Sequence, residues 1–378
     1  MRMTRLLSCA LVIVNLGVVL CGCDPRDDEP PAREAIPTES SELPGEQATD
    51  AVAPEIPMSP IFRLPPGGYS PVANALLMTV CVPTGGSEYG FPKMTRFLAR
   101  YEEKEKLLGT HLLPTATSLF DVAWIPGKSA FIVTHGDRMT LYRRDAGGTF
   151  AGTAVPCPVD FLYVYCSWNP EGRWLALMCS DIRIGKGGFK LGLYDRKRNR
   201  YVGGTIVMEP VRPVWKDNAT VYVLTDRGLA EVRVETPLHA PAIMRIIPLQ
   251  TGVSQFYGMF EALPLTRQGK EIRLGNSTLA ELDHASDVRV AMTDTTIFIS
   301  ASPSRLLAFN RQGHNVAALD PGSTIQLGPA AGAPPRAYGL VDSRLLCVTL
   351  DGTTLRTEEL CDLSNFQGAQ EIAGHAIP

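Results

Sequence analysis

The sequence predicts an all-β protein, a β-propeller of about seven four-stranded blades that follows a signal segment and a tether. Three observations support this prediction. Short alternating strands are separated by Gly, Asp and Asn turns, which is typical of successive β-hairpins. Tryptophans at positions 124, 168 and 215 mark a repeat of 44 and then 47 residues. Weaker copies extend this period, and a four-stranded propeller blade has a typical length of about 40–45 residues.

The clearest repeat unit begins with residues 167–180, SWNPEGRWLALMCS, which predict a strand, an Asn-Pro-Glu-Gly turn and a second strand. Residues 186–202 follow and predict two further strands around a charged turn. Residues 121–150 and 212–235 repeat the same order of Trp, polar turn, apolar strand, Gly/Asp turn and alternating strand. In a propeller, alternating strands of this kind bury one face against the neighbouring blade.

Weaker copies of the unit start at residues 75–85, 255–265, 287–313 and 338–360. From Val80 to Leu340 the average repeat is about 43 residues, so seven blades fit residues 61–378 best. Six or eight blades remain open, because the copy near residue 287 is displaced. The segment from Ile61 to about Ser70 is expected to add an edge strand to the last blade and so close the ring.

One repeat resembles the WD-like, TolB-type propeller repeat, whose core is W-S-P-D-G-x-x-[IL]-A-[FL]. The matching residues are Trp168, Pro170, Gly172, Leu175 and Ala176. Asn169 and Glu171 replace the usual Ser and Asp, and the repeats around Trp124 and Trp215 lack the Pro-Asp-Gly turn. The resemblance implies the fold and says little about activity.

Residues 1–22 predict a secretory signal peptide. Arg2 and Arg5 precede a 15-residue apolar run from Leu6 to Leu20, which is shorter than the roughly 20 residues of a transmembrane helix. The following Leu-Cys-Gly-Cys, residues 20–23, resembles a bacterial lipobox. The resemblance implies cleavage before Cys23 and lipidation of that residue by acyl chains such as palmitate. Cys21 is the weaker candidate, because it places bulky Leu20 directly before the cleavage site.

Residues 23–60 predict a disordered tether between the anchor and the propeller of residues 61–378. Positions 24–60 contain ten acidic residues, two arginines and eight prolines. Such a segment cannot bury enough apolar surface to offset the entropy of ordering the chain. The protein is therefore expected to be exported and held to a bacterial membrane through Cys23, on the periplasmic or cell-surface side.

The net charge and the cysteine spacing indicate which kinds of partner and of metal site to expect. The net charge of −3 becomes −5 without residues 1–22, which argues against a nucleic-acid partner. The six cysteines of the predicted propeller match no zinc-site spacing, and both disulfides and small buried thiols remain open for them. These cysteines are Cys81, Cys157, Cys166, Cys179, Cys347 and Cys361.

Motifs for catalysis, metal binding and cofactors are missing from the sequence, so no catalytic residue, metal ligand or cofactor is predicted. The candidate channel-lining carboxylates are Asp121, Asp160 and Asp287, which stand before predicted innermost strands. Together they could bind a cation or act as acid and base, although turn or capping roles are favoured. The basic run at residues 196–200 predicts a solvated hairpin tip or, less favoured, a patch for an acidic partner.

These observations favour a non-catalytic binding or assembly scaffold for an envelope protein or polysaccharide. The alternative is a propeller-fold hydrolase or lyase that acts on glycans or lactones with the channel carboxylates. A redox propeller with a quinone cofactor is least favoured, because such proteins use tryptophan motifs in most blades and only four tryptophans occur here.

Overall fold

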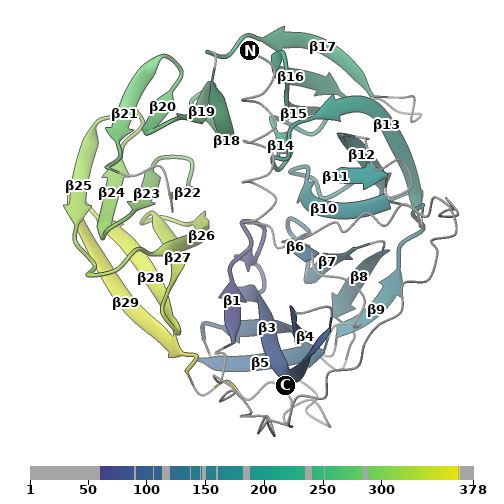
Figure 1. The fold of residues 1–378 in the computed structure, drawn as a ribbon, viewed down its shortest axis with the longest axis horizontal. Coiled ribbons are helices and arrows are strands. Elements are labelled where there is room, and N and C mark those ends of the chain that lie inside the picture. The colour runs from purple at the N-terminus through teal and green to yellow at the C-terminus, as the bar shows by residue number, and fades with distance from the viewer. Residues whose placement is uncertain are drawn as a thin grey trace, which may run out of the picture. The chain divides into compact units, whose positions relative to one another are not determined.

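The computed structural model describes residues 60–366, with gaps at 89–90, 105, 113–119, 137, 145, 147–149, 159–160, 182–187, 235–240, 251, 284–287 and 365. Every regular element in these residues is a β-strand, and the strands form seven antiparallel sheets. The sheets stand as blades of a closed ring, as Figure 1 shows. The all-β, seven-bladed fold is therefore confirmed, whereas the predicted signal peptide and nearly all of the predicted tether lie outside the described residues.

The first four blades occupy residues 61–247. Blade 1 contains β1 (Ile61–Arg63), β2 (Tyr69–Ser70), β3 (Ala75–Glu88), β4 (Phe91–Glu102) and β5 (Leu107–Leu112). Blade 2 contains β6 (Phe120–Trp124), β7 (Ala130–His135), β8 (Arg138–Arg144) and β9 (Phe150–Ala154). Blade 3 contains β10 (Phe161–Trp168), β11 (Trp174–Asp181), β12 (Phe189–Asp195) and β13 (Arg200–Met208). Blade 4 contains β14 (Val214–Trp215), β15 (Thr220–Thr225), β16 (Gly228–Arg233) and β17 (Ala242–Ile247).

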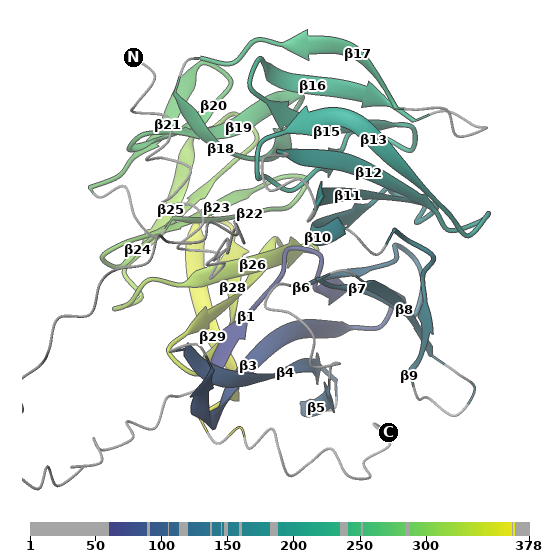
Figure 2. The same ribbon diagram turned by 45° about the vertical axis from the view of Figure 1, so that its right-hand side comes forward.

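The last three blades complete the ring (Figure 2). Blade 5 contains β18 (Val253–Phe260), β19 (Leu263–Gln268), β20 (Glu271–Leu274) and β21 (Ser277–Glu281). Blade 6 contains β22 (Arg289–Met292), β23 (Ile297–Ala301), β24 (Arg305–Phe309) and β25 (Asn315–Leu319). Blade 7 contains β26 (Gln326–Ala331), β27 (Arg336–Val341), β28 (Arg344–Asp351) and β29 (Thr354–Asp362). The repeat copies expected at 75–85 and 338–360 coincide with β3 and β27, so they begin one strand after the innermost strand.

The core is divided into seven clusters, and each cluster fills the space between two neighbouring blades. Strand β11 shows the cause. Leu175 and Leu177 face the cluster shared with blade 2, whereas Ala176 and Met178 face the cluster shared with blade 4. Alternate residues of a strand point to opposite faces, so a strand buried on both faces is apolar throughout. The unbroken apolar run WLALMC follows from this position.

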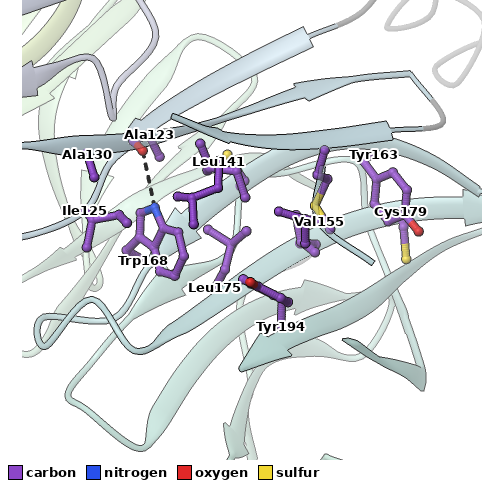
Figure 3. Close-up of a cluster of buried hydrophobic side chains, with 14 residues drawn as sticks. Ala123, Ile125, Ala130, Leu141, Val155, Tyr163, Trp168, Leu175, Cys179 and Tyr194 are labelled. Carbon is purple, nitrogen blue, oxygen red and sulfur yellow. Dashed lines mark hydrogen bonds between the residues drawn. The ribbon is translucent and has the colours of Figure 1, made fainter. Parts of the chain in front are cut away.

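The three tryptophans of the repeat tie neighbouring blades together. Trp168 at the end of β10 donates its indole N–H to the carbonyl of Ala123 in β6, at 3.2 Å (Figure 3). Trp215 donates in the same way to Ser167 of β10 at 2.8 Å, and Trp124 donates to Gly68 of blade 1 at 2.8 Å. Each ring therefore reaches the innermost segment of the preceding blade. The repeat spacing of the tryptophans is the length of one blade.

The ring closes differently from the prediction. Residues 61–70 do not extend blade 7, because β1 and β2 both pair with β3 of blade 1. Gly67, which lies between β1 and β2, forms a β-bridge to Ala123 of blade 2. A side chain at the neighbouring Gly68 would lie 2.6 Å from the carbonyl oxygen of Leu77. This close approach requires glycine and holds the segment to the first two blades.

Side chains close the ring between blades 7 and 1. The rings of Tyr69 and Tyr338 lie 4.9 Å apart, and the Tyr101 hydroxyl donates to the carbonyl of Leu360 at 3.0 Å. Tyr338 also donates a short hydrogen bond to Glu103. An interface of packed rings and hydrogen bonds thus takes the place of the shared sheet that the sequence predicted.

All six cysteines of the predicted propeller are free thiols. Cys166, Cys179 and Cys347 are buried in the clusters between blades. Of the two alternatives left open by the sequence, the structure supports small thiols rather than disulfides.

The contribution of the Trp168 hydrogen bond to stability can be distinguished from the contribution of ring size by comparing Trp168→Phe with Trp174→Phe. Both tryptophans are buried, but the indole N–H of Trp174 makes no hydrogen bond to the described residues. We expect Trp168→Phe to lower the free energy of unfolding by about 1 kcal/mol more than Trp174→Phe, because a buried carbonyl loses its donor. Urea denaturation followed by fluorescence measures the difference, and equal losses would contradict the proposed tie.

Candidate binding surfaces

Only one of the predicted site residues lies in the described part of the chain. Asp121 is the second residue of β6, on the innermost strand of blade 2. Cys23, Asp160 and Asp287 lie outside the described residues, so their lipidation and channel-lining roles stay predictions. The structure therefore describes the surroundings of Asp121 alone.

The carboxylate of Asp121 is buried at 3% exposure and ion-paired with Arg212 from the segment before β14. Its Oδ1 accepts from Arg212 Nη2 at 2.8 Å, while its Oδ2 lies 2.7 Å from Nη1. Oδ2 also accepts from the backbone N–H of Cys166 in β10 at 2.9 Å. One carboxylate thus joins the inner segments of blades 2, 3 and 4.

The geometry gives this centre a structural role. The guanidinium engages both carboxylate oxygens, and it also donates to the carbonyl of Cys166 and lies 5.3 Å from the ring centroid of Tyr165. Burial, reinforced by the nearby charge of Asp121, raises the pKa of the Cys166 thiol well above its usual range, so the thiol stays protonated and unreactive. Across the described residues, no three His, Cys, Asp or Glu side chains are placed to hold a metal ion.

A second buried carboxylate ties the inner and outer parts of blade 4. Glu231 on β16 lies 2.5 Å from Lys216 Nζ and makes a short ion pair with Arg245 Nε on β17. The hydrogen bond from Lys216, together with Arg245, lowers the pKa of Glu231 although burial acts in the opposite direction. Glu231 therefore stabilises the fold in its charged form.

An apolar groove runs along the outer strands of blades 3 and 4. It is lined by Ile206, Val207, Thr225, Asp226, Arg227, Pro241, Ile243 and Ile246. Val207 is 58% exposed and Ile243 is 44% exposed, and the neighbouring Met244 is 54% exposed. Within the described residues β17 pairs with β16 alone, so the backbone groups on its outer edge have no strand partner there.

Positive charge gathers on a different surface, at the turns of blades 2 and 3. We call this surface the basic face. Its members are Lys128, Arg143, Arg173, Arg196, Lys197, Arg198 and Arg200. The two sets of turns are packed together, since a side chain at Gly172 would lie 2.5 Å from Ile125 Cγ2. The basic face therefore extends across two blades and includes the run at residues 196–200.

Comparisons with known proteins show no family for this chain. No protein-family model and no curated protein matches the chain. Among solved structures, a chain in "Crystal Structure of Mitotic Checkpoint Complex" is similar, with 12% identity and a TM-score of 0.46 over 64% of this chain and 78% of that chain. The architecture itself defines the class, a seven-bladed β-propeller protein.

The sequence alone did not indicate Arg212, the groove or the three members of the basic face outside residues 196–200. Arg212 is 91 residues from Asp121, and Val207 and Ile243 lie on different blades. The apolar side chains at 243 and 244 are exposed, although the sequence around them resembles that of a buried strand. The basic run at 196–200 was the one visible signal, and the structure adds Lys128 and Arg143 from the preceding blade to it.

The ion pair between Asp121 and Arg212 can be tested with Arg212→Met. The variant leaves a buried carboxylate with the Cys166 N–H as its remaining donor, so we expect a loss of about 3 kcal/mol in the free energy of unfolding. Asp121→Asn in the same chain should recover part of the loss, because the buried charge is then removed. Urea denaturation measures both, and a loss below about 1 kcal/mol for Arg212→Met would contradict the structural role.

Glu231 predicts a pH dependence. Since its pKa in the folded chain lies below the ordinary value of 4.5, its charged form contributes stability above that value, and the contribution is lost as pH falls through the lowered pKa. We expect Glu231→Gln to be less stable than wild type at neutral pH and the difference to shrink as pH falls below 4.5. Thermal denaturation at several pH values measures this difference, and a pH-independent difference would count against it.

Proposed function

We propose that this chain is a lipid-anchored β-propeller of the cell envelope that acts as a non-catalytic binding or assembly scaffold for a protein partner. The anchor rests on the lipobox-like residues 20–23 and on Cys23, which the sequence alone suggests. None of the described residues belongs to a helix of the length and apolarity needed to cross a membrane.

One observation carries the binding role, the apolar groove between the outer strands of blades 3 and 4. Exposed apolar side chains that lie together on a soluble fold are typical of surfaces that bind another protein. Val207 and Ile243 of the lining are exposed, as is the neighbouring Met244, and Asp226 and Arg227 add polar groups to the lining. The groove therefore combines an apolar centre with charged groups, as protein interfaces do.

The backbone favours a polypeptide over a polysaccharide as the partner. The outer edge of β17 has no neighbouring strand among the described residues, and its N–H and C=O groups alternate along the groove. An extended peptide can add to such an edge through main-chain hydrogen bonds while its side chains enter the groove. A polysaccharide has no backbone N–H and C=O groups with which to continue the sheet.

The rigid ring supports the scaffold role. Blades 3 and 4 pack against each other in one apolar cluster and are joined by the hydrogen bond of Trp215, which supports a groove that is formed before a partner binds. In this proposal the tether of residues 23–60 separates the propeller from the membrane, and the propeller provides the binding surface. The groove on blades 3 and 4 determines which partner binds.

The proposal predicts that partner binding depends on the groove. We expect Val207→Asp combined with Met244→Asp to abolish crosslinking to the partner in cells, because two charges are placed on apolar contacts. Val72→Asp is the matched control, since Val72 on blade 1 is also 58% exposed. Affinity capture followed by mass spectrometry identifies the crosslinked protein in each strain.

The anchor is tested in the same experiment. Cys23→Ser should leave the membrane fraction and lose the partner, whereas Cys21→Ser should behave as wild type. A partner that stays bound to the Val207→Asp/Met244→Asp chain would contradict the groove, and a membrane-bound Cys23→Ser chain would contradict the anchor.

A further inference from the structure

The basic face lies apart from the proposed partner groove and has a charge that the rest of the chain does not explain. The chain has a net charge of −3, yet seven Lys and Arg residues gather at the turns of blades 2 and 3. Among the described residues of these turns, Asp195 and Glu171 are the carboxylates present, and Asp195 is completely buried. The exposed charge of this surface is therefore strongly positive.

Contacts beneath the surface hold the cations in place. Oδ1 of the buried Asp195 accepts from the backbone N–H of Lys197 at 2.9 Å and faces that of Arg198 at 3.4 Å. Its Oδ2 lies 3.4 Å from Arg173 Nη2 and 3.9 Å from Arg198 Nη1. Arg196 Nε donates to the carbonyl of Gly172 at 2.7 Å. One buried carboxylate thus orders the turn and orients two guanidinium groups.

Blade 2 contributes to the same surface. Lys128 lies in the turn whose Ile125 contacts Gly172 of blade 3, and Arg143 pairs with Ala130 directly after that turn. Burial raises the pKa of the Tyr194 phenol, and the charges of Arg143 and Arg196 oppose that rise, so a cation from each of the two blades lies near this phenol. The charge is therefore a property of the interface between two blades rather than of a single flexible tip.

Elsewhere in the ring, some turn cations are paired with surface carboxylates. Arg311 lies 3.3 Å from Glu261, and Arg356 lies 3.4 Å from Asp351. No such exposed partner is found in the described residues for Lys128, Lys197 or Arg200. Asp195 pairs with Arg173 and Arg198, so Lys128, Lys197 and Arg200 are the cations of the basic face that have no carboxylate partner among the described residues.

We propose that the basic face binds an acidic polypeptide segment, a second binding activity beyond the groove. Five of its seven cations are arginines, and a guanidinium binds a carboxylate through two parallel hydrogen bonds. Trp174 and Tyr194 beneath the face are buried, and the guanidinium of Arg173 covers the Trp174 ring at 4.8 Å. The described part of the face thus offers charge and guanidinium forks but no exposed aromatic ring on which a base could stack.

The binding is expected to be electrostatic and sensitive to salt. Cations exposed on one surface attract an acidic chain over about a Debye length, which is roughly 10 Å at 0.1 M salt. Such attraction raises the rate of association more than it slows dissociation. The ordered arginines then add directional hydrogen bonds to aspartate and glutamate side chains.

The test measures binding of a fluorescein-labelled polyglutamate peptide to the full-length chain by fluorescence anisotropy. The charge-reversal variant is Lys197→Glu/Arg200→Glu, because neither side chain is hydrogen-bonded or ion-paired to the Asp195 carboxylate that orders the turn. The matched control is Arg305→Glu/Arg356→Glu, which makes the same change in net charge on exposed positions of blades 6 and 7. Circular dichroism melting establishes that all chains are folded.

We expect polyglutamate to bind wild type and the control alike at about 50 mM salt, and to bind the Lys197→Glu/Arg200→Glu chain about tenfold or more weakly. Equal binding to the two double variants, or no binding to wild type, would overturn the proposal. Polygalacturonate and phosphatidylglycerol vesicles are the competing probes. If either of them depends on Lys197 and Arg200 while polyglutamate does not, the surface recognises a polysaccharide or a membrane and the proposal is wrong.

Failure of this proposal is distinguishable from failure of the proposed function. The Val207→Asp/Met244→Asp chain should bind polyglutamate as wild type does, because the groove lies on the outer strands of blades 3 and 4. Conversely, the Lys197→Glu/Arg200→Glu chain should keep the crosslink made through the groove. Loss of both activities in either variant would show that the two surfaces form one site, which contradicts an independent basic face.

Discussion

The structure depends on one constraint, that every blade must bury both of its faces against neighbouring blades. In β11, Leu175 enters the cluster shared with blade 2 and Ala176 enters the cluster shared with blade 4. A single four-stranded sheet with two apolar faces cannot be stable in water, so each blade needs two neighbours. Only a closed ring gives two neighbours to all seven blades.

The ring must therefore be closed between its first and last blades, and in this chain side-chain contacts close it. Blade 7 consists of consecutive strands at the end of the ring, and β1 remains with blade 1. The buried side chains of Phe97, Tyr101 and Tyr338 join these two blades in one cluster. Because the described residues show no backbone pairing across this interface, its stability comes from apolar packing and a few hydrogen bonds.

The two halves of the ring are tied differently. Tryptophan N–H groups join blades 1 to 4 in series, and the pair of Asp121 and Arg212 spans blades 2, 3 and 4 in the same arc. Blades 5 to 7 contain no tryptophan, and a backbone tie such as the Ile325 N–H to the Ser300 hydroxyl, at 3.0 Å, joins blades 6 and 7. The groove and the basic face both lie on the arc that carries the polar ties. A binding surface that is already ordered does not add the entropic cost of its own ordering to the free energy of binding.

The sequence by itself determined the fold class and the position of the most regular blades, because strand alternation, turn residues and the recurring tryptophan are local signals. It also predicted the signal peptide and the lipidation of Cys23, because both predictions rest on local sequence alone. The tertiary structure decided the partner of Asp121, the closure of the ring and the surfaces on blades 2 to 4. Each of these joins residues from different blades, such as Asp121 with Arg212 or Val207 with Ile243. Contacts between residues so far apart in the chain exist only after the blades have packed, and no periodicity within one repeat encodes them.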